Sequence, residues 1–178
     1  YDDMTGNAAG YAAVALSENG IFTGEQIGSS MVFFPEDLVT RGEFLAMCMQ
    51  LAGTELLTGV MSTGFTDDGD IPLWQKSYVA TALMDGIIDG YSGDGSVVFD
   101  ATAAITCSEA AVMLDNIMEL TNVSVSRYAD TAPAWACQSV ANLSACDIMP
   151  DGCVYNAKLT RADAALMLVA AMELLESR

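Results

Sequence analysis

The sequence contains no histidine, and it has only six lysines and arginines against 24 aspartates and glutamates. The lack of histidine removes the usual general base near neutral pH, the histidine-activated nucleophiles and the commonest zinc ligand. The scarcity of basic residues argues against nucleic acid and against an anionic membrane surface as partners, because both depend on lysine and arginine. We therefore expect no metal site and no cofactor. The acidity suits a soluble protein exported to a cell surface.

The sequence also lacks a long apolar run. The longest uninterrupted one, residues 164–172, is too short to cross a bilayer, which needs about 20 residues. The apolar content of 52% is nonetheless high, as helices buried on several faces would require. No signal peptide is visible, and Tyr1 already belongs to the first predicted repeat. We therefore expect the sequence to be a fragment of a larger surface protein.

The five cysteines show no C-x-x-C spacing, which argues against a zinc site. Two readings of the cysteines stay open. Cys146 and Cys153 flank a short loop and could form a disulfide, which an exported protein would tolerate. Alternatively, cysteines such as Cys48 and Cys137 are small buried apolar residues, the usual role of a free cysteine.

What the sequence does contain is one short phrase three times, each time before an apolar segment with helical spacing. The copies are Val-Thr-Arg-Gly-Glu (39–43), Ile-Thr-Cys-Ser-Glu (105–109) and Leu-Thr-Arg-Ala-Asp (159–163). Thr-x-x-Glu is a capping box, in which the threonine oxygen accepts an N–H of the first turn and the glutamate reaches back to the threonine N–H. We predict that Thr40, Thr106 and Thr160 are helix N-caps. Asp163 is shorter than glutamate and should cap less well.

Other features recur ahead of each phrase. An aromatic residue stands two positions before an aspartate at residues 1–3, 65–67 and 128–130. Trp74 stands twelve positions before Gly86, and Trp135 stands twelve positions before Asp147. Such recurrence predicts a repeat architecture, in which one unit cannot bury its apolar face alone and its neighbours complete the core.

The predicted repeats span about residues 1–57, 65–120 and 128–178 of one domain. Each should consist of two helices around an irregular loop. The first helices should begin near Asp70 with Pro72 and near Thr131 with Pro133, where a polar cap precedes a proline, and they should end near Gly86 and Asp147. Residues 89–95 are dense in turn formers and predict a loop. The expected fold class is all-α, built from three helical hairpins.

Taken in order, these motifs resemble S-layer homology repeats over nearly the whole chain. They are the aromatic-x-Asp pair, the tryptophan, Gly-Ile-x-x-Gly, Phe-x-Pro (33–35) and Thr-Arg-x-Glu. The resemblance implies a pseudo-threefold, spindle-like domain in which three helical-hairpin repeats share a central helical bundle. It also implies a secreted protein that attaches non-covalently to secondary cell-wall polymers of bacteria, typically glycans carrying pyruvate ketals. In that family the phrase arginine lines inter-repeat grooves that hold the sugar and its carboxylate.

By this resemblance, Arg41 and Arg161 anchor the glycan. A guanidinium can take a carboxylate bidentately, and the first-turn N–H groups and helix dipole beside it favour negative charge, even in an acidic protein. The full set of predicted ligand-binding residues is Arg41, Arg161, Thr40, Thr160, Trp74, Trp135, Asp67, Asp130 and Gly90. Plainer roles compete with this one: packing for the tryptophans, turns or caps for the aspartates, and a surface salt bridge for the arginines.

The sequence departs from the family pattern in ways that limit the number of sites. Cys107 stands where the other two phrases have arginine, Ala8 stands at the tryptophan position of the first repeat, and the third loop is shorter. At most two grooves should bind. The alternative is a structural or protein-interaction module that has kept the fold and lost its glycan sites. We do not expect an enzyme, because 24 acids make some pair of glycosidase-like carboxylates inevitable and their presence is no evidence.

Overall fold

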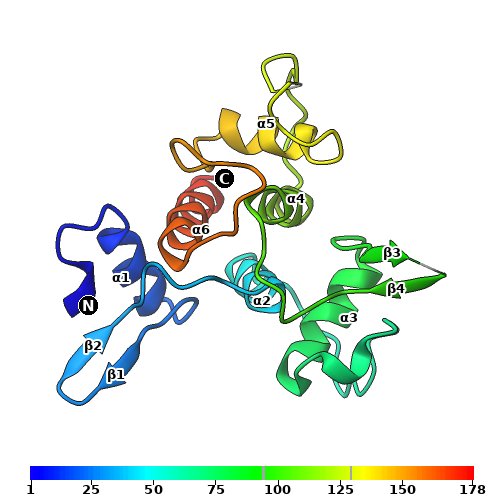
Figure 1. Ribbon diagram of the computed structural model, residues 1–178, viewed down its shortest axis with the longest axis horizontal. Coiled ribbons are helices and arrows are strands. Elements are labelled where there is room, and N and C mark those ends of the chain that lie inside the picture. Colours follow the sequence, from blue (N-terminus) through cyan, green and yellow to red (C-terminus); the bar gives the residue numbers. More distant parts are fainter. Residues whose placement is uncertain (94, 129) are drawn as a thin grey trace.

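The computed structural model describes residues 1–93, 95–128 and 130–178, and these residues are mainly helical (Figure 1). The α-helices are α1 (Gly10–Glu18), α2 (Arg41–Leu51), α3 (Lys76–Met84), α4 (Cys107–Met118), α5 (Cys137–Ala145) and α6 (Arg161–Glu176). Three short 3-10 helices complete the helical part: η1 (Asp2–Met4), η2 (Asp68–Asp70) and η3 (Leu73–Gln75). Within the described residues, no helix is both long and apolar enough to span a membrane.

The expectation of an all-α fold is wrong in one respect, because two β-hairpins occupy the loops after α1 and α3. β1 (Glu25–Ile27) pairs antiparallel with β2 (Ser30–Val32), and β3 (Tyr91–Gly93) pairs antiparallel with β4 (Ser96–Val98). Strands of three residues are too short to show an alternating pattern, so the sequence indicated only turns. The predicted loop at 89–95 includes Asp94, and the third aromatic-x-Asp motif includes Ala129; both residues lie outside the described ones.

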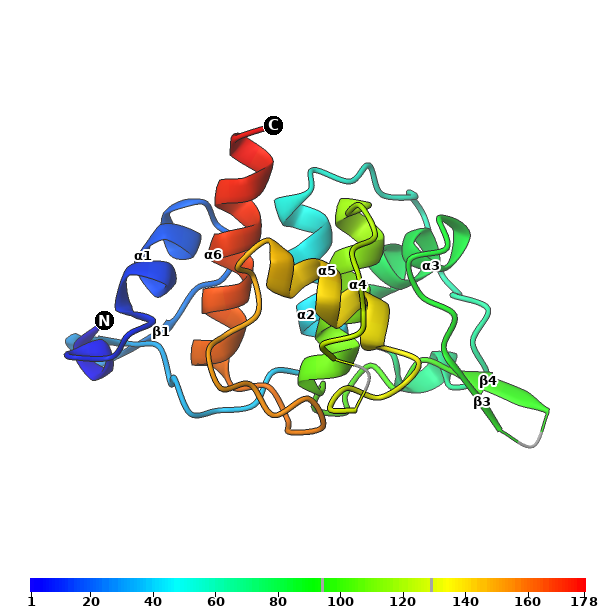
Figure 2. The ribbon, with the colours of Figure 1, turned by 90° about the horizontal axis from the view of Figure 1, so that it is seen from above.

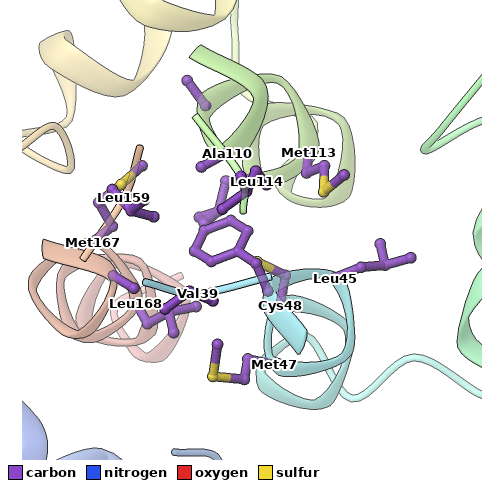
Figure 3. Close-up of a cluster of buried hydrophobic side chains, with 14 of the residues drawn as sticks. Val39, Leu45, Met47, Cys48, Ala110, Met113, Leu114, Leu159, Met167 and Leu168 are labelled. Atoms are coloured by element: carbon purple, nitrogen blue, oxygen red, sulfur yellow. The ribbon is translucent and has the colours of Figure 1, made fainter. Parts of the chain in front are cut away.

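Helices α2, α4 and α6 lie side by side at the centre of the molecule, with α1, α3 and α5 around them (Figure 1). Helix α3 packs against α2, α5 packs against α4, and α1 packs against α6. Figure 2 shows the long α6 running beside α1 and extending beyond it. Leu45, Leu114 and Met167 come from the three central helices and are each at most 1% exposed (Figure 3). The core is therefore shared among segments that are far apart in the sequence.

The phrase threonines cap the central helices, as predicted. In α2 and α4 the threonine hydroxyl accepts the N–H of the glutamate, and the glutamate accepts the N–H of the threonine, which completes a capping box. In α6 the Thr160 hydroxyl accepts the Asp163 N–H at 3.1 Å. The shorter Asp163 carboxylate accepts the Thr160 hydroxyl at 2.9 Å in place of its backbone N–H. The capping box is thus incomplete in α6, where aspartate is one methylene shorter than glutamate.

The residues just before the cap threonines form a closed ring of backbone hydrogen bonds. The N–H of Val39 donates to the carbonyl of Leu159 at 3.1 Å, and the N–H of Leu159 donates to the carbonyl of Ile105 at 2.8 Å. The N–H of Ile105 donates back to the carbonyl of Val39 at 2.9 Å. All three side chains are at most 2% exposed. The starts of the three central helices are therefore joined to one another directly.

The first two N–H groups of each central helix are bonded as well. They donate to carbonyls of the segment that precedes another central helix: Arg41 to Ala103, Gly42 to Ala101, Cys107 to Ala157, Ser108 to Tyr155, Arg161 to Asp37 and Ala162 to Pro35, all at 2.8–3.1 Å. These groups normally lack a partner within the helix. Here they hold neighbouring segments together, and the three junctions share one backbone geometry.

The outer helices begin later than predicted. Pro72 precedes the 3-10 turn η3, and α3 begins only at Lys76. Likewise Pro133 lies four residues before the start of α5 at Cys137. A proline fits the first turn of either helix type, so its position does not fix the α-helical start.

The ends of these outer helices are as predicted. Gly86 and Asp147 follow α3 and α5 with φ of 70° and 56°, the left-handed conformation typical of helix ends.

The cysteines pair differently from the predicted bridge. The disulfide joins Cys107 to Cys153, and Cys146 is free. Sequence spacing could not indicate this partner, because Cys107 reaches residue 153 only once the α4 start has bonded to the segment before α6. Cys48 and Cys137 are buried and free, as the packing reading predicted.

Candidate functional site

A groove of about 520 Å³ lies where four parts of the chain meet, and we call it the Arg41 groove. Its lining residues are Arg41, Ile87, Ile88, Asp89, Gly90, Tyr91, Glu109, Val112, Met113, Asn116 and Trp135. Arg41 is the first residue of α2, Trp135 precedes α5, and the others come from α4 and the segment leading into β3. The groove brings together three predicted site residues, Arg41, Gly90 and Trp135.

Arg41 is buried in the wall of this groove, with 5% of its surface exposed. Its Nε–H donates to the carbonyl of Phe99 at 2.9 Å, and Nη1 lies 3.3 Å from Oε1 of Glu109. The guanidinium carbon lies 4.4 Å from the centre of the Tyr91 ring and 5.2 Å from that of Phe99. These contacts fix the orientation of the guanidinium and already balance its charge.

Glu109 serves two helix starts at once. Its Oε2 accepts the N–H of Thr106 in the α4 capping box, while Oε1 faces Arg41 and accepts a hydrogen bond from the Tyr91 hydroxyl. Burial by itself would raise the pKa of the Glu109 carboxyl. The hydrogen bonds from Tyr91 and Thr106 and the charge of Arg41 outweigh burial and hold that pKa below its usual range, so Glu109 is ionised at neutral pH. Burial and the bond to Glu109 raise the pKa of the Tyr91 hydroxyl, which stays protonated.

The tryptophans are exposed, so the packing role predicted for them is wrong. Trp135 is 62% exposed at the rim of the Arg41 groove, and Trp74 is 58% exposed in η3. Trp74 makes an edge-on contact with Tyr78 at 6.3 Å between ring centres. Both lie ahead of an α-helix in turns that carry side chains away from the core. An exposed indole beside polar groups is a suitable platform for a sugar ring.

Arg161 occupies the corresponding position at the start of α6, away from the Arg41 groove. Its Nε–H donates to the carbonyl of Phe33 at 2.7 Å, and Nη2 donates to the carbonyl of Thr23 at 2.9 Å. Its guanidinium carbon lies 4.3 Å from the ring centre of Phe22. Burial lowers the pKa of Arg161, although nearby carboxylates oppose the shift. Within the described residues Arg161 forms no ion pair, so its charge is less balanced than that of Arg41.

The remaining predicted site residues have structural roles or lie apart. Thr40 and Thr160 are caps. Asp67 accepts the N–H groups of Phe99 and Asp100 at 3.0 and 2.8 Å, which fixes the segment that contacts Arg41. Asp130 is exposed and lies outside the groove lining.

Gly90 lines the groove, but packing explains its identity. A Cβ at this position would lie 2.5 Å from the Phe65 ring and 2.7 Å from the carbonyl of Val98. Its φ of 74° is also one that other residues rarely adopt. The glycine therefore permits the close approach of β4 and the Phe65 ring.

The first-turn N–H groups do not offer the predicted anion site. Those of Arg41 and Arg161 donate to backbone carbonyls, and those at the third helical position donate to the cap threonines. An anion at either helix start would have to displace these bonds. A ligand would therefore have to bind the arginine side chains and the groove walls.

Three groove residues escaped the sequence analysis. Tyr91 lies in a stretch that indicated only a turn, Glu109 was interpreted only as a cap, and Asn116 stands among apolar residues in a segment with helical spacing. The Asn116 side chain donates to the carbonyl of Ile87 at 2.9 Å and so holds the groove floor to α4. A polar side chain at a core-spaced position was the one available signal. Among the described residues, no cluster of three or more cysteines and acids could hold a metal ion.

Comparison with known proteins adds one relationship. The chain is 32% identical over 123 residues to the surface-layer 125 kDa protein of Lysinibacillus sphaericus. The match covers 67% of this chain but only 10% of that much longer protein. No family model matches the chain. The match indicates distant, partial homology to a surface-layer protein, and it suggests a protein of the cell surface.

Proposed function

We propose that the protein is a non-catalytic module that anchors a larger surface protein to the bacterial cell wall. It would do so by holding a secondary cell-wall polymer in grooves between three helical-hairpin repeats. The homology to a surface-layer protein supports a place at the cell surface. The cyclic bonding of Val39, Ile105 and Leu159 supports the threefold arrangement of repeats.

The Arg41 groove is the observation that carries the proposal. It combines an exposed indole, Trp135, with the buried guanidinium of Arg41, the partly buried carboxylate of Glu109 and an apolar floor. Sugars present both apolar faces and hydroxyl edges, so a site for them needs an aromatic platform beside fixed donors and acceptors. A volume of about 520 Å³ lies within the range of ordinary ligand sites.

The ion pair in the groove determines what kind of glycan fits. Because Glu109 already balances Arg41, a neutral sugar meets a satisfied polar wall, whereas a ketal carboxylate meets a guanidinium shared with another carboxylate. Arg161 lacks such a partner among the described residues and is the stronger anion anchor. We infer that the two arginine junctions contribute unequally, with the acidic groups of the polymer taken at Arg161.

The test is binding to purified cell-wall sacculi before and after the secondary polymer is stripped away. We expect binding only before stripping. Trp135→Ala should weaken it roughly tenfold through loss of the aromatic platform. Met84→Ala is the matched control, because Met84 is 73% exposed and lies outside the groove lining. Equal binding to stripped sacculi, or unchanged binding by Trp135→Ala, would contradict the proposal.

Arginine variants test the anion anchors separately. Arg41→Ala and Arg161→Ala should each weaken binding to a pyruvylated wall glycan by roughly ten- to a hundredfold, with the larger loss at Arg161. The double variant should not bind. Arg127→Ala removes an exposed positive charge elsewhere and controls for the slower association that any lost charge causes.

A second candidate function is a structural module without glycan binding. The pairing of Arg41 with Glu109 and the occupied N–H groups of the helix starts favour it, because both devices also serve stability alone. Calorimetry separates the two functions. If the folded wild type binds no wall polymer, glycan binding is excluded and the structural role is favoured.

A further inference from the structure

The three junctions differ in one pair of side chains although their backbones are alike. At each junction the first helical residue donates its N–H to the residue three positions before another cap threonine. That first residue is Arg41, Cys107 or Arg161. Differences at this position therefore arise from the side chains alone.

At two junctions the side-chain pair is arginine with phenylalanine. The partner of Arg41 is Phe99, and the partner of Arg161 is Phe33, each seven positions before a cap threonine. In both pairs Nε–H donates to the phenylalanine carbonyl, at 2.9 and 2.7 Å, and the guanidinium lies over the ring, at 5.2 and 4.7 Å. Each arginine thereby joins the start of one central helix to the segment that precedes another central helix.

At the third junction both members of the pair are cysteine. Cys107 replaces the arginine, and Cys153, seven positions before Thr160, replaces the phenylalanine. These two residues form the disulfide. The covalent bond therefore joins the same two positions that the arginine and phenylalanine join elsewhere.

The third junction also lacks a second support. Asp3 accepts the N–H of Phe33 at 2.8 Å, and Asp67 accepts that of Phe99 at 3.0 Å. The acid of the third aromatic-x-Asp motif, Asp130, is exposed, and the N–H of Cys153 donates to the carbonyl of Pro150 at 3.2 Å instead. Among the described residues, the segment before α6 therefore lacks the aspartate contact of its two counterparts. It is held instead by the Ser108 hydroxyl, which donates to the carbonyl of Tyr155 at 2.8 Å, and by the Lys158 ammonium, which donates to the carbonyl of Ala104 at 2.6 Å.

We propose that the Cys107–Cys153 disulfide is a covalent substitute for the arginine–phenylalanine contact, which makes this junction a redox-dependent lock. The bond forms when two thiols lose two protons and two electrons to an oxidised dithiol, which is reduced. Reduction by a dithiol reverses the step and leaves two thiols with no guanidinium to bridge them. The junction then keeps its backbone bonds and the side-chain bonds of Ser108 and Lys158, beside a cavity of about 220 Å³ lined by both cysteines. This inference does not depend on glycan binding.

The first test counts thiols. Denatured, unreduced protein should react with iodoacetamide at three cysteines, and prior reduction should expose all five. Peptide mapping should recover residues 107 and 153 in one cross-linked pair. Five reactive thiols before reduction, or a cross-link between Cys146 and Cys153, would overturn the proposal.

The second test exchanges one contact for the other. Cys107→Ala with Cys153→Ala should lower the melting temperature by roughly 5–15 °C, as reduction of the wild type should. Cys107→Arg with Cys153→Phe should regain most of this loss and should not respond to dithiothreitol. Cys107→Lys with Cys153→Phe is the matched control, because lysine supplies the charge without the planar fork. If the arginine–phenylalanine variant has the same melting temperature as the double-alanine variant, the two contacts are not equivalent and the proposal fails.

Discussion

The side chain of Gln75 lies directly against the backbone of Gly42. A Cβ on Gly42 would be 2.0 Å from Oε1 of Gln75, although Gly42 sits in the first turn of α2 and Gln75 ends η3. Gln75 is 3% exposed, and its Oε1 has no hydrogen-bond partner among the described residues. Any larger residue at position 42 would therefore force this buried side chain to move.

This fit predicts a compensating pair of variants. Gly42→Ala should destabilise the protein by about 1–3 kcal/mol through overpacking, and Gln75→Ala in the same chain should remove that clash. Gln75→Met should stabilise by about 1 kcal/mol, because it keeps the volume and removes a buried unpaired oxygen. Urea unfolding of the wild type, the two single alanine variants, the double variant and Gln75→Met measures these effects. Simple additivity of the two alanine changes would show that the residues do not interact.

The helix caps predict graded losses of stability. Thr40→Ala, Thr106→Ala and Thr160→Ala should each cost roughly 0.5–2 kcal/mol, since each removes the acceptor of a first-turn N–H. The loss should be smallest at Thr160, where the reciprocal half of the box is not formed by Asp163. Asp163→Glu should stabilise α6 by supplying the missing reach. Thermal melts with no loss at all three threonines would contradict the role of these caps.

The Arg41–Glu109 pair predicts a change in ligand preference. Glu109→Gln keeps the capping box, which glutamine can also complete, but removes the carboxylate that balances Arg41. We expect roughly tenfold tighter binding of an acidic wall glycan and little change for a neutral one. Calorimetry with both glycans measures the difference. Glu55→Gln is the control, because Glu55 is exposed and lies outside the groove lining. Equal gains in the two variants would exclude a specific role for Glu109.

Asp68 predicts a defined acid sensitivity. The hydrogen bond from Lys76, supported by Thr63, lowers the pKa of the Asp68 carboxyl from 3.8 to about 2. A lowered native pKa means that the stabilisation is fully present above the unfolded-state value and is lost as the pH falls through the native one. The stability advantage of the wild type over Asp68→Asn should therefore shrink between pH 4 and 2. Urea midpoints in that range measure it, and a constant difference would contradict the assignment.

Local features of the sequence were sufficient to predict part of this structure. The caps at Thr40 and Thr106 follow from side chains three residues apart, and the left-handed ends at Gly86 and Asp147 follow from residue type and spacing. Such features are decided within one turn of chain. They therefore appear in the sequence itself.

The remaining features depend on residues that only the fold brings together. The contact between Arg41 and Phe99 spans 58 residues, and that between Arg161 and Phe33 spans 128. No local pattern encodes those distances. The exposure of Trp135 could not be predicted either, since a tryptophan that precedes an apolar helix can face the core or the solvent. The sequence could therefore predict that Arg41 belongs to the candidate site, but not which other residues line the groove.

The backbone ring through Val39, Ile105 and Leu159 has a mechanical consequence. Each segment donates to one neighbour and accepts from the other, so a pull on any one of them strains two hydrogen bonds together. Tension that enters through α6 is also shared with α1, which packs along it. Peeling from one end cannot proceed bond by bond past this ring. A domain built in this way should resist an applied force until the three hydrogen bonds of the ring break together.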